Sequence, residues 1–368
     1  MNKVDAIKDK INTMSLDEKI GQLIIGGFNG YTVDSNTEKL IKENHLGGFI
    51  LFQRNVENPN QLLELTNTLK SLNKENIAPL FISTDEEGGN VTRMPKEIKK
   101  LPSNSYIGKI NNEDFSYNIG KTLGKELNAF GINMDYAPVL DINSNPNNPV
   151  IGIRSFGNNK DIVTRLGTRT MEGIKSQNVI PVVKHFPGHG DTSVDSHMGL
   201  PIVNHDLKRL TDFELVPFKS AIDKDADAVM VAHILLPKLD PKYPATLSYN
   251  IITNLLRKDL GFDGVVITDD MTMGAIIKNY DIGDAAVKST NAGADIILVS
   301  HQYENIQKVF NSIKESVLNK TITEDRLNES VYRILSLKEK YKLTDNKINS
   351  VDVNEINKSI TDVLNNKY

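Results

Sequence analysis

Eight short apolar runs, separated by longer amphipathic stretches, constrain the fold of this chain more than any other feature of its sequence. Each run is continuously apolar instead of alternating, which is typical of strands buried on both faces of a parallel sheet. The runs span residues 22–28, 47–52, 79–85, 133–140, 179–185, 228–233, 264–270 and 294–300. Stretches such as 60–72, 161–176 and 303–318 lie between them and indicate amphipathic helices.

Strands that alternate with helices predict βαβ units, and eight of them fit a closed (β/α)8 TIM barrel better than an open doubly wound sheet. An open sheet usually has a glycine fingerprint after its first strand, which GGFNGY at 26–31 matches poorly. Ser15 and Glu18 have the spacing of a helix capping box. We therefore predict an α/β fold with one barrel domain over residues 1–345. A closing C-terminal helix over 323–341 belongs to it, and a short polar extension follows over 346–368.

The composition excludes several kinds of binding partner and several kinds of chemistry. The net charge of −4 and the pI of about 6.0 give no sign of a nucleic-acid surface. The absence of cysteine excludes disulfides, thiolate catalysis and zinc–thiolate sites. No apolar run reaches the roughly 18 residues of a membrane helix, and the charged first 19 residues do not resemble a secretory signal. We expect a cytoplasmic monomer that binds a small, neutral molecule and uses neither metal nor cofactor.

Polar residues gather where the predicted strands end, which is the face on which barrel enzymes build their active sites. They are Asp85 after the third strand, Asp135 and Asp141 after the fourth with Arg154 in the next loop, Lys184 and His185 after the fifth, His233 after the sixth, and Asp269 and Asp270 after the seventh. Because five strand ends contribute in register, the sequence predicts a polar site at this face.

The densest polar cluster is KHFPGHGDTSVDSHMGLP, the histidine loop (residues 184–201). A lone histidine is usually structural, but three histidines and two aspartates on one loop favour a functional site. Asp195 and His197 form an Asp-x-His pair, in which the carboxylate orients the imidazole and leaves the other ring nitrogen to exchange a proton. The alternative is an ion pair that only stabilises the loop.

Asp269 is the second-last residue of the seventh run, GVVITDD. A carboxylate at this end of a barrel strand points into the barrel mouth, where it can attack the anomeric carbon of a sugar. The alternative is that Asp269 caps the following helix. Asp270 should face another way.

These segments together resemble glycoside hydrolase family 3, and within it the β-N-acetylglucosaminidases of the NagZ type. The resemblance rests on SLDEKIGQL, TDEEGGNVTR, GIRSFG, KHFPGHGDTSVDSH and ITDDMTMGA, in that order. It implies a retaining exo-β-N-acetylglucosaminidase, also called a β-N-acetylhexosaminidase. Such an enzyme would remove terminal N-acetylglucosamine from peptidoglycan fragments or chitin oligosaccharides.

By position, the resemblance implies that Asp269 is the nucleophile, and that His197 is the general acid/base with Asp195 as its partner. It also implies that the sugar is bound by Asp85, Arg93, Arg154, Lys184 and His185. Two positions depart from the family pattern, since Asn90 stands where arginine is usual and Glu86 where glutamine is frequent. Both concern the detail of the sugar subsite.

Three other functions stay open on the sequence alone. A metal-dependent hydrolase could take its ligands from His185, His189, Asp191, Asp195 and His197. In a glycoside phosphorylase phosphate replaces water, and a histidine acid/base would repel phosphate less than a glutamate. A non-catalytic sugar-binding barrel would normally have lost part of the catalytic set, which is complete here.

Overall fold

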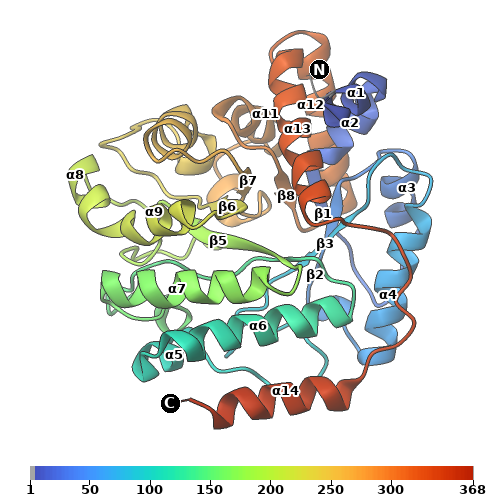
Figure 1. Ribbon diagram of the computed structural model, residues 1–368. Helices are drawn as coiled ribbons and strands as arrows, with labels where there is room; N and C mark the ends of the chain where they lie inside the picture. Colours follow the sequence, from blue (N-terminus) through green and yellow to red (C-terminus); the bar gives the residue numbers. More distant parts are fainter. Residues whose placement is uncertain (1–4, 368) are drawn as a thin grey trace.

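The computed structural model describes residues 5–367. Within this range eight parallel strands form one sheet, and helices surround the strands (Figure 1). The strands are β1 (Ile24–Gly27), β2 (Gly48–Leu51), β3 (Phe81–Thr84), β4 (Met134–Asp135), β5 (Ile180–Phe186), β6 (Ala228–Val231), β7 (Val265–Thr268) and β8 (Ile297–Val299). Each coincides with one of the eight predicted runs. Because nearly every strand residue is buried, the runs are apolar throughout instead of alternating.

The strands form one sheet in the order β7-β6-β5-β4-β3-β2-β1-β8, with parallel pairing throughout. A further parallel bridge joins Ile267 of β7 to Ile296, the residue before β8, so the two end strands meet. The predicted α/β class and TIM barrel are thereby confirmed. β4 is shorter than its apolar run of 133–140. Pro138 lies in this run and has no N–H to donate to a ladder.

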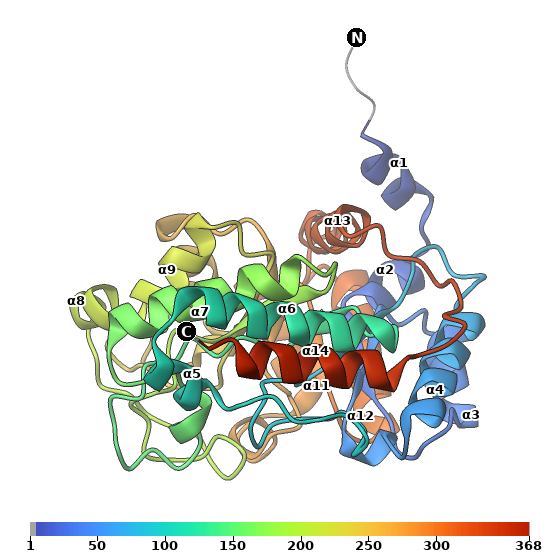
Figure 2. The same cartoon turned by 60° about the horizontal axis from the view of Figure 1, so that its bottom comes forward.

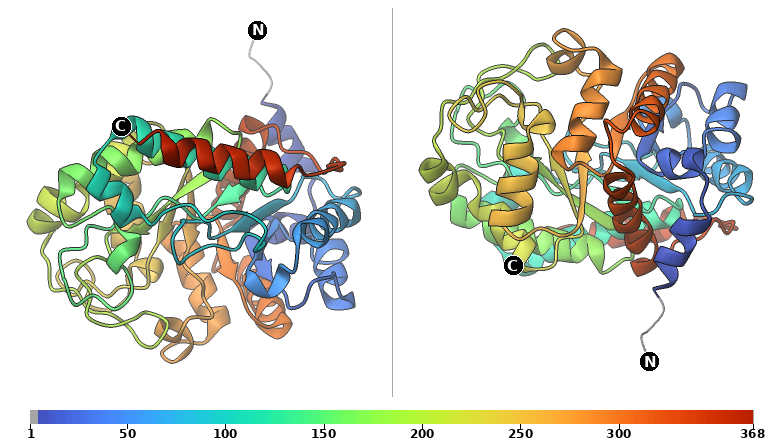
Figure 3. Two further views of the ribbon diagram at one scale, coloured as in Figure 1. Left: turned by 90° about the horizontal axis from the view of Figure 1, so that it is seen from below. Right: turned by 90° about the horizontal axis from the view of Figure 1, so that it is seen from above.

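Helices surround the strands when the molecule is viewed from below or above (Figure 3). They are α1 (Ala6–Thr13), α2 (Leu16–Gln22), α3 (Ser35–Lys42), α4 (Pro59–Leu72), α5 (Asn104–Ile110), α6 (Glu113–Ala129), α7 (Lys160–Lys175), α8 (Leu207–Arg209), α9 (Val216–Asp223), α10 (Gly274–Ile277), α11 (Ile282–Ala292), α12 (Tyr303–Leu318), α13 (Glu324–Lys340) and α14 (Val353–Asn365). Short 3-10 segments span Gln53–Asn55, Gly152–Arg154 and Ala245–Leu247, and π-helical segments span Leu210–Glu214 and Asn250–Asp259. None of the helices within residues 5–367 has the length and apolarity needed to cross a bilayer.

The local signals that predicted helices are realised in the structure. The Ser15 hydroxyl accepts a hydrogen bond from the backbone N–H of Glu18, and the Glu18 carboxylate accepts one from the N–H of Ser15, which confirms the capping box at α2. The helices predicted at 60–72, 161–176 and 303–318 correspond to α4, α7 and α12 within one residue.

The predicted closing helix is α13, which covers the end of the barrel opposite the carboxyl ends of the strands. Its buried Lys338 donates to the side chain of Gln22 at 2.7 Å and to the carbonyl of Gly47 at 3.0 Å. These two residues lie just before β1 and β2. Burial lowers the pKa of the Lys338 ammonium to about 7.

The C-terminal extension contains α14, which lies alongside α6 on the outside of the barrel (Figures 1 and 2). Ile356, Ile360 and Val363 are buried on its inner face. The Asn357 side chain accepts from the N–H of Lys99 at 2.7 Å. The helix therefore packs against the barrel through both apolar burial and hydrogen bonds.

Candidate active site

A pocket opens at the carboxyl ends of the strands, and seven of the eight predicted site residues line it. These seven are Asp85, Arg93, Arg154, Lys184, His185, His197 and Asp269. The eighth, Asp195, lies behind His197 and binds it. The apolar side chains of Ile50, Met230 and Leu298 also face the pocket. Residues far apart in the sequence meet here because every parallel strand of a barrel ends at the same face.

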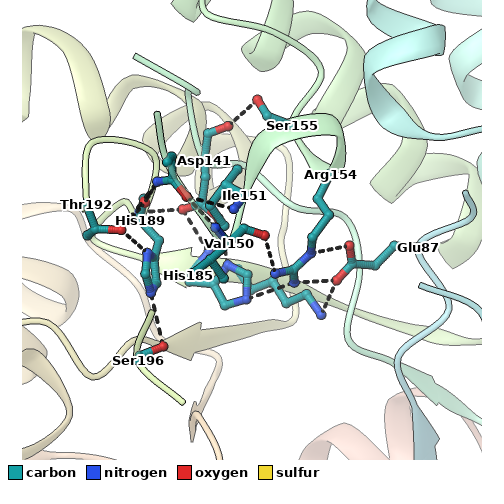
Figure 4. A network of polar contacts seen from close by, with 12 residues as sticks. Glu87, Asp141, Val150, Ile151, Arg154, Ser155, His185, His189, Thr192 and Ser196 are labelled. Atoms are coloured by element: carbon teal, nitrogen blue, oxygen red, sulfur yellow. Dashed lines mark hydrogen bonds and ion pairs between the residues drawn. The ribbon is translucent and has the colours of Figure 1, made fainter. Parts of the chain in front are cut away.

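A charged wall of this pocket is formed by Asp85, Glu87, Arg154 and Lys184. Glu87 lies at its centre and was not predicted from the sequence (Figure 4). Arg154 contacts its carboxylate through two nitrogens, Nε at 2.9 Å and Nη2 at 2.7 Å. The Lys184 ammonium lies 2.8 Å from the same carboxylate and 2.7 Å from Asp85. Burial acts to raise the pKa of Glu87, but the charges of Lys184 and Arg154 outweigh it and hold this pKa well below its usual range.

The neighbouring Glu86 points away from the pocket. Its carboxylate accepts from the backbone N–H of Arg93 at 2.7 Å and from the hydroxyl of Thr92 at 3.0 Å. Burial raises the pKa of Glu86 to about 7. Neither Glu86 nor Asn90 lines the pocket, so the two departures from the family pattern lie outside its wall. Glu86 instead holds the backbone that carries Arg93.

Asp141 orients the imidazole of His185 (Figure 4). The distance from its carboxylate to His185 Nδ1 is 2.6 Å, and the carboxylate also accepts from the backbone N–H of His189 at 2.6 Å. Burial acts to raise the pKa of Asp141, but His185 and His189 outweigh it and lower this pKa. Since an ionised carboxylate only accepts, His185 donates through Nδ1 and presents Nε2, 3.4 Å from Arg154 Nη2, to the pocket.

The predicted Asp-x-His pair is formed on the histidine loop. Asp195 Oδ1 lies 2.8 Å from His197 Nδ1 and accepts the backbone N–H of His197 at 2.8 Å. Partial burial acts to raise the pKa of Asp195, but its bonds to His197 outweigh this effect and lower the pKa. The His197 side chain is 64% exposed, so its second ring nitrogen is accessible to substrate and water. This geometry suits reversible proton transfer.

Asp269 follows β7, and its side chain is partly exposed to the pocket. One carboxylate oxygen accepts from the backbone N–H of Asp270 at 2.8 Å. Burial acts to raise the pKa of Asp269, but His233, His185 and this N–H outweigh it, and the pKa lies below its usual range. The carboxylate is thus ionised at neutral pH, as a nucleophile must be.

Asp269 does not cap the following helix α10, whose N-cap is Met273 with no side-chain hydrogen bond, and the neighbouring Asp270 binds loop backbone instead. Its Oδ1 accepts from the backbone N–H groups of Thr272 and Ser300, both at 3.0 Å. Beneath it, the buried His233 lies between the carbonyl of Asp270 at 2.9 Å and the hydroxyl of Thr246 at 2.6 Å. Asp270 and His233 therefore support the loop that follows Asp269.

The side chains considered as metal ligands have other partners. His189 contacts the hydroxyls of Thr192 at 2.7 Å and Ser196 at 3.2 Å, while Asp191 lies 2.8 Å from His205. Within residues 5–367, no three His, Asp or Glu side chains converge in a way that could hold a metal ion.

The chain matches the model of a known protein family and is similar in sequence to several known proteins. A family model described as Glycosyl hydrolase family 3 N terminal domain matches residues 15–337. Beta-hexosaminidase A of Pseudoalteromonas piscicida is 37% identical over 333 residues, which cover 84% of this chain and 56% of that protein. Beta-hexosaminidase of Neisseria meningitidis serogroup C (strain 053442) is 35% identical over 294 residues, which cover 78% of this chain and 80% of that one.

A solved structure, that of a glycoside hydrolase family 3 beta-N-acetylglucosaminidase from Paenibacillus sp. str. FPU-7, superposes with a TM-score of 0.90 at 43% identity. The match covers 95% of this chain and 68% of that chain. The present chain thus spans little more than half the length of the Pseudoalteromonas relative and about two thirds of the Paenibacillus structure.

Proposed function

The chain belongs to glycosyl hydrolase family 3, as its sequence predicts, and from this premise we propose that it is a retaining exo-β-N-acetylglucosaminidase. It would remove terminal N-acetylglucosamine through a covalent glycosyl-enzyme intermediate. The observation that carries the proposal is the Asp195–His197 pair at the pocket that also holds Asp269. Retaining glycosidases usually use two carboxyl groups, and here a histidine bound to an aspartate stands in for one of them.

In the first step, the Asp269 carboxylate attacks the anomeric carbon and forms a bond to it while the glycosidic bond breaks. His197 gives its proton to the departing oxygen, so the leaving group departs as a neutral alcohol. The lowered pKa of Asp269 supports this role, because the carboxylate is ionised at neutral pH.

In the second step, His197 takes a proton from water, and the water oxygen attacks the anomeric carbon. The bond to Asp269 breaks, which releases the sugar and returns both residues to their starting states. Asp195 stabilises the imidazolium in the first step and keeps the same ring orientation in the second.

The charged wall fits the polar face of one sugar residue. Asp85 and His185 Nε2 can accept hydrogen bonds from hydroxyl groups, while Lys184, Arg154 and Arg93 can donate to hydroxyls and to the acetamido carbonyl. Since Glu87 already binds Lys184 and Arg154, these donors are held in place before a sugar arrives. We propose peptidoglycan fragments as the natural substrates, with chitin oligosaccharides as the next candidates.

The test is hydrolysis of p-nitrophenyl N-acetyl-β-glucosaminide beside the corresponding β-glucoside. We expect activity on the acetamido sugar alone, and its abolition in Asp269→Ala. Asp284→Ala, which removes an exposed carboxylate on α11, is the matched control and should keep wild-type turnover. Activity that survives in Asp269→Ala would refute the assignment of the nucleophile.

Three additions to the same assay separate the alternatives. Turnover should not change with EDTA, whereas a metal-dependent hydrolase would lose it. Turnover should not need phosphate, and release of the sugar 1-phosphate would instead identify a phosphorylase. Chitobiose and a disaccharide fragment of peptidoglycan, compared by kcat/KM, would then rank the two substrate classes.

A further inference from the structure

The tip of the histidine loop is bound through its main chain to the segment that follows Asp269. Three consecutive carbonyls of the loop accept hydrogen bonds from this segment. The bonds run from Gly274 N to His197 O at 3.3 Å, from Ala275 N to Ser196 O at 3.0 Å and from Lys278 Nζ to Met198 O at 2.7 Å. The loop that carries the acid/base therefore rests on the start of helix α10, a few residues after the nucleophile.

The inner side of the same tip is fixed by a buried histidine. His189 Nε2 lies 3.2 Å from the hydroxyl of Ser196, and His189 Nδ1 lies 2.7 Å from the hydroxyl of Thr192. Ser196 is buried, with only 2% of its surface exposed. Ser196 is thus held on both its side chain and its carbonyl, while the adjacent His197 side chain reaches into the pocket opening. This arrangement fixes the backbone of His197 and leaves its ring accessible.

Gly274 permits the close approach of the two segments. A Cβ at this position would lie 2.5 Å from the carbonyl oxygen of His197, whereas ordinary contacts begin near 3.4 Å. The clashing atom belongs to the backbone, so no side-chain rotation can relieve it. Any larger residue at position 274 would require the two segments to separate by close to 1 Å.

We propose that Gly274 is a positioning residue that sets the place of His197 relative to Asp269. The proposal rests on the function proposed above, in which His197 is the acid/base. Gly274 touches neither sugar nor reacting atoms in this scheme. It acts through the His197 carbonyl, and because it lies five residues after Asp269 it ties both catalytic groups to one short segment.

The test compares Gly274→Ala with Gly199→Ala. Gly199 lies on the same loop, and a Cβ there would meet only a methyl group of Val194, at an ordinary distance of 3.7 Å. A displacement of about 1 Å at a catalytic group can cost roughly 100-fold in rate. In Gly274→Ala we expect kcat/KM for chitobiose, whose leaving group needs protonation, to fall by about this factor. For 2,4-dinitrophenyl N-acetyl-β-glucosaminide, kcat/KM should stay near the wild-type value, and Gly199→Ala should match wild type on both substrates.

The selectivity between the two leaving groups is the readout that a merely structural defect would not produce. Equal losses on both substrates, or no loss on either, would overturn the proposal. If Gly274→Ala does not fold, Lys278→Ala decides the matter, because it removes one docking bond and should show the same selectivity with a smaller loss. If the wild-type protein is inactive on both substrates, the proposed function is refuted instead. If His197→Ala shows the selective loss but Gly274→Ala and Lys278→Ala do not, only the positioning role of Gly274 is refuted.

Discussion

Replacing Glu87 by glutamine should destabilise the protein by about 3 kcal/mol, because it removes the charge that Arg154 contacts inside the charged wall. Breaking a buried ion pair from one side typically costs about 3–5 kcal/mol. Lys184 keeps Asp85 as a partner at 2.7 Å, while the two bonds from Arg154 to the carboxylate lose its charge. Because only Arg154, and not Lys184, loses its charged partner, we expect a cost at the lower end of this range.

The pH dependence of this cost follows from the lowered pKa of Glu87. A carboxylate with a lowered folded-state pKa stabilises the protein fully above its unfolded pKa of about 4.3, and this stabilisation is lost as the pH falls through the folded-state pKa. The difference in unfolding free energy between wild type and Glu87→Gln should therefore be constant at neutral pH. It should shrink only when the pH falls below about 4.3.

The assay is urea unfolding of both proteins across this pH range, together with kcat/KM. Glu329→Gln is the matched control, because Glu329 also contacts two arginines, Arg326 at 3.0 Å and Arg333 at 2.7 Å, but its side chain is 51% exposed. Exposed ion pairs contribute only about 0.2–1 kcal/mol. A Glu87→Gln effect as small as that of Glu329→Gln would refute the reasoning, as would a difference that grows on acidification.

Three further outcomes are expected. The lowered pKa of Asp269 should keep kcat/KM at its full value as the pH falls to about 5, above the usual aspartate pKa of ~3.9; a half-maximal value above that pH would contradict an ionised nucleophile. Asp141→Asn should raise KM for N-acetylglucosaminides about tenfold, equivalent to ~1.4 kcal/mol, because it removes the charge that orients His185; steady-state kinetics with an unchanged KM would count against it. Ile360→Ala should cost about 2–5 kcal/mol in urea unfolding, since α14 buries this side chain completely, whereas the partly exposed Leu364→Ala should cost less.

The sequence was sufficient to predict the barrel because its strands are buried on both faces. Their apolar runs therefore mark all eight positions, and the amphipathic stretches between them mark helices such as α7 and α12 within one residue. The convergence of Asp85, Lys184 and Asp269 on one pocket followed from topology alone, since the carboxyl ends of parallel strands share a face.

Glu87 was not predicted as a site residue because the residues that it contacts are distant in the sequence. Arg154 is 67 residues away from it, and no local pattern reveals this pairing. A weaker signal was present, since side chains alternate along extended backbone and Glu87 is two residues after Asp85. The structure follows this alternation, with Asp85 and Glu87 in the pocket and Glu86 directed away.

The docking of the histidine loop was unpredictable for another reason. Its acceptors are main-chain carbonyls of residues 196–198, which every residue type possesses, so no choice of side chain in the loop signals the contact. Among the residues of this contact, only Gly274 is of a type that the contact requires. Glycine after a strand also occurs in turns that contact no other segment, so it does not predict the contact.

The histidine loop binds the segment after Asp269 through backbone carbonyls, so exposed side chains at its tip can be replaced without loss of these hydrogen bonds. Met198 and Val194 are 68% and 42% exposed and lie one residue after and three residues before the acid/base His197. Directed evolution could therefore vary these two positions to recognise new leaving groups without disturbing the alignment of the catalytic pair. Libraries built there, with Gly274 held fixed, should retain a higher fraction of active clones than libraries that include position 274.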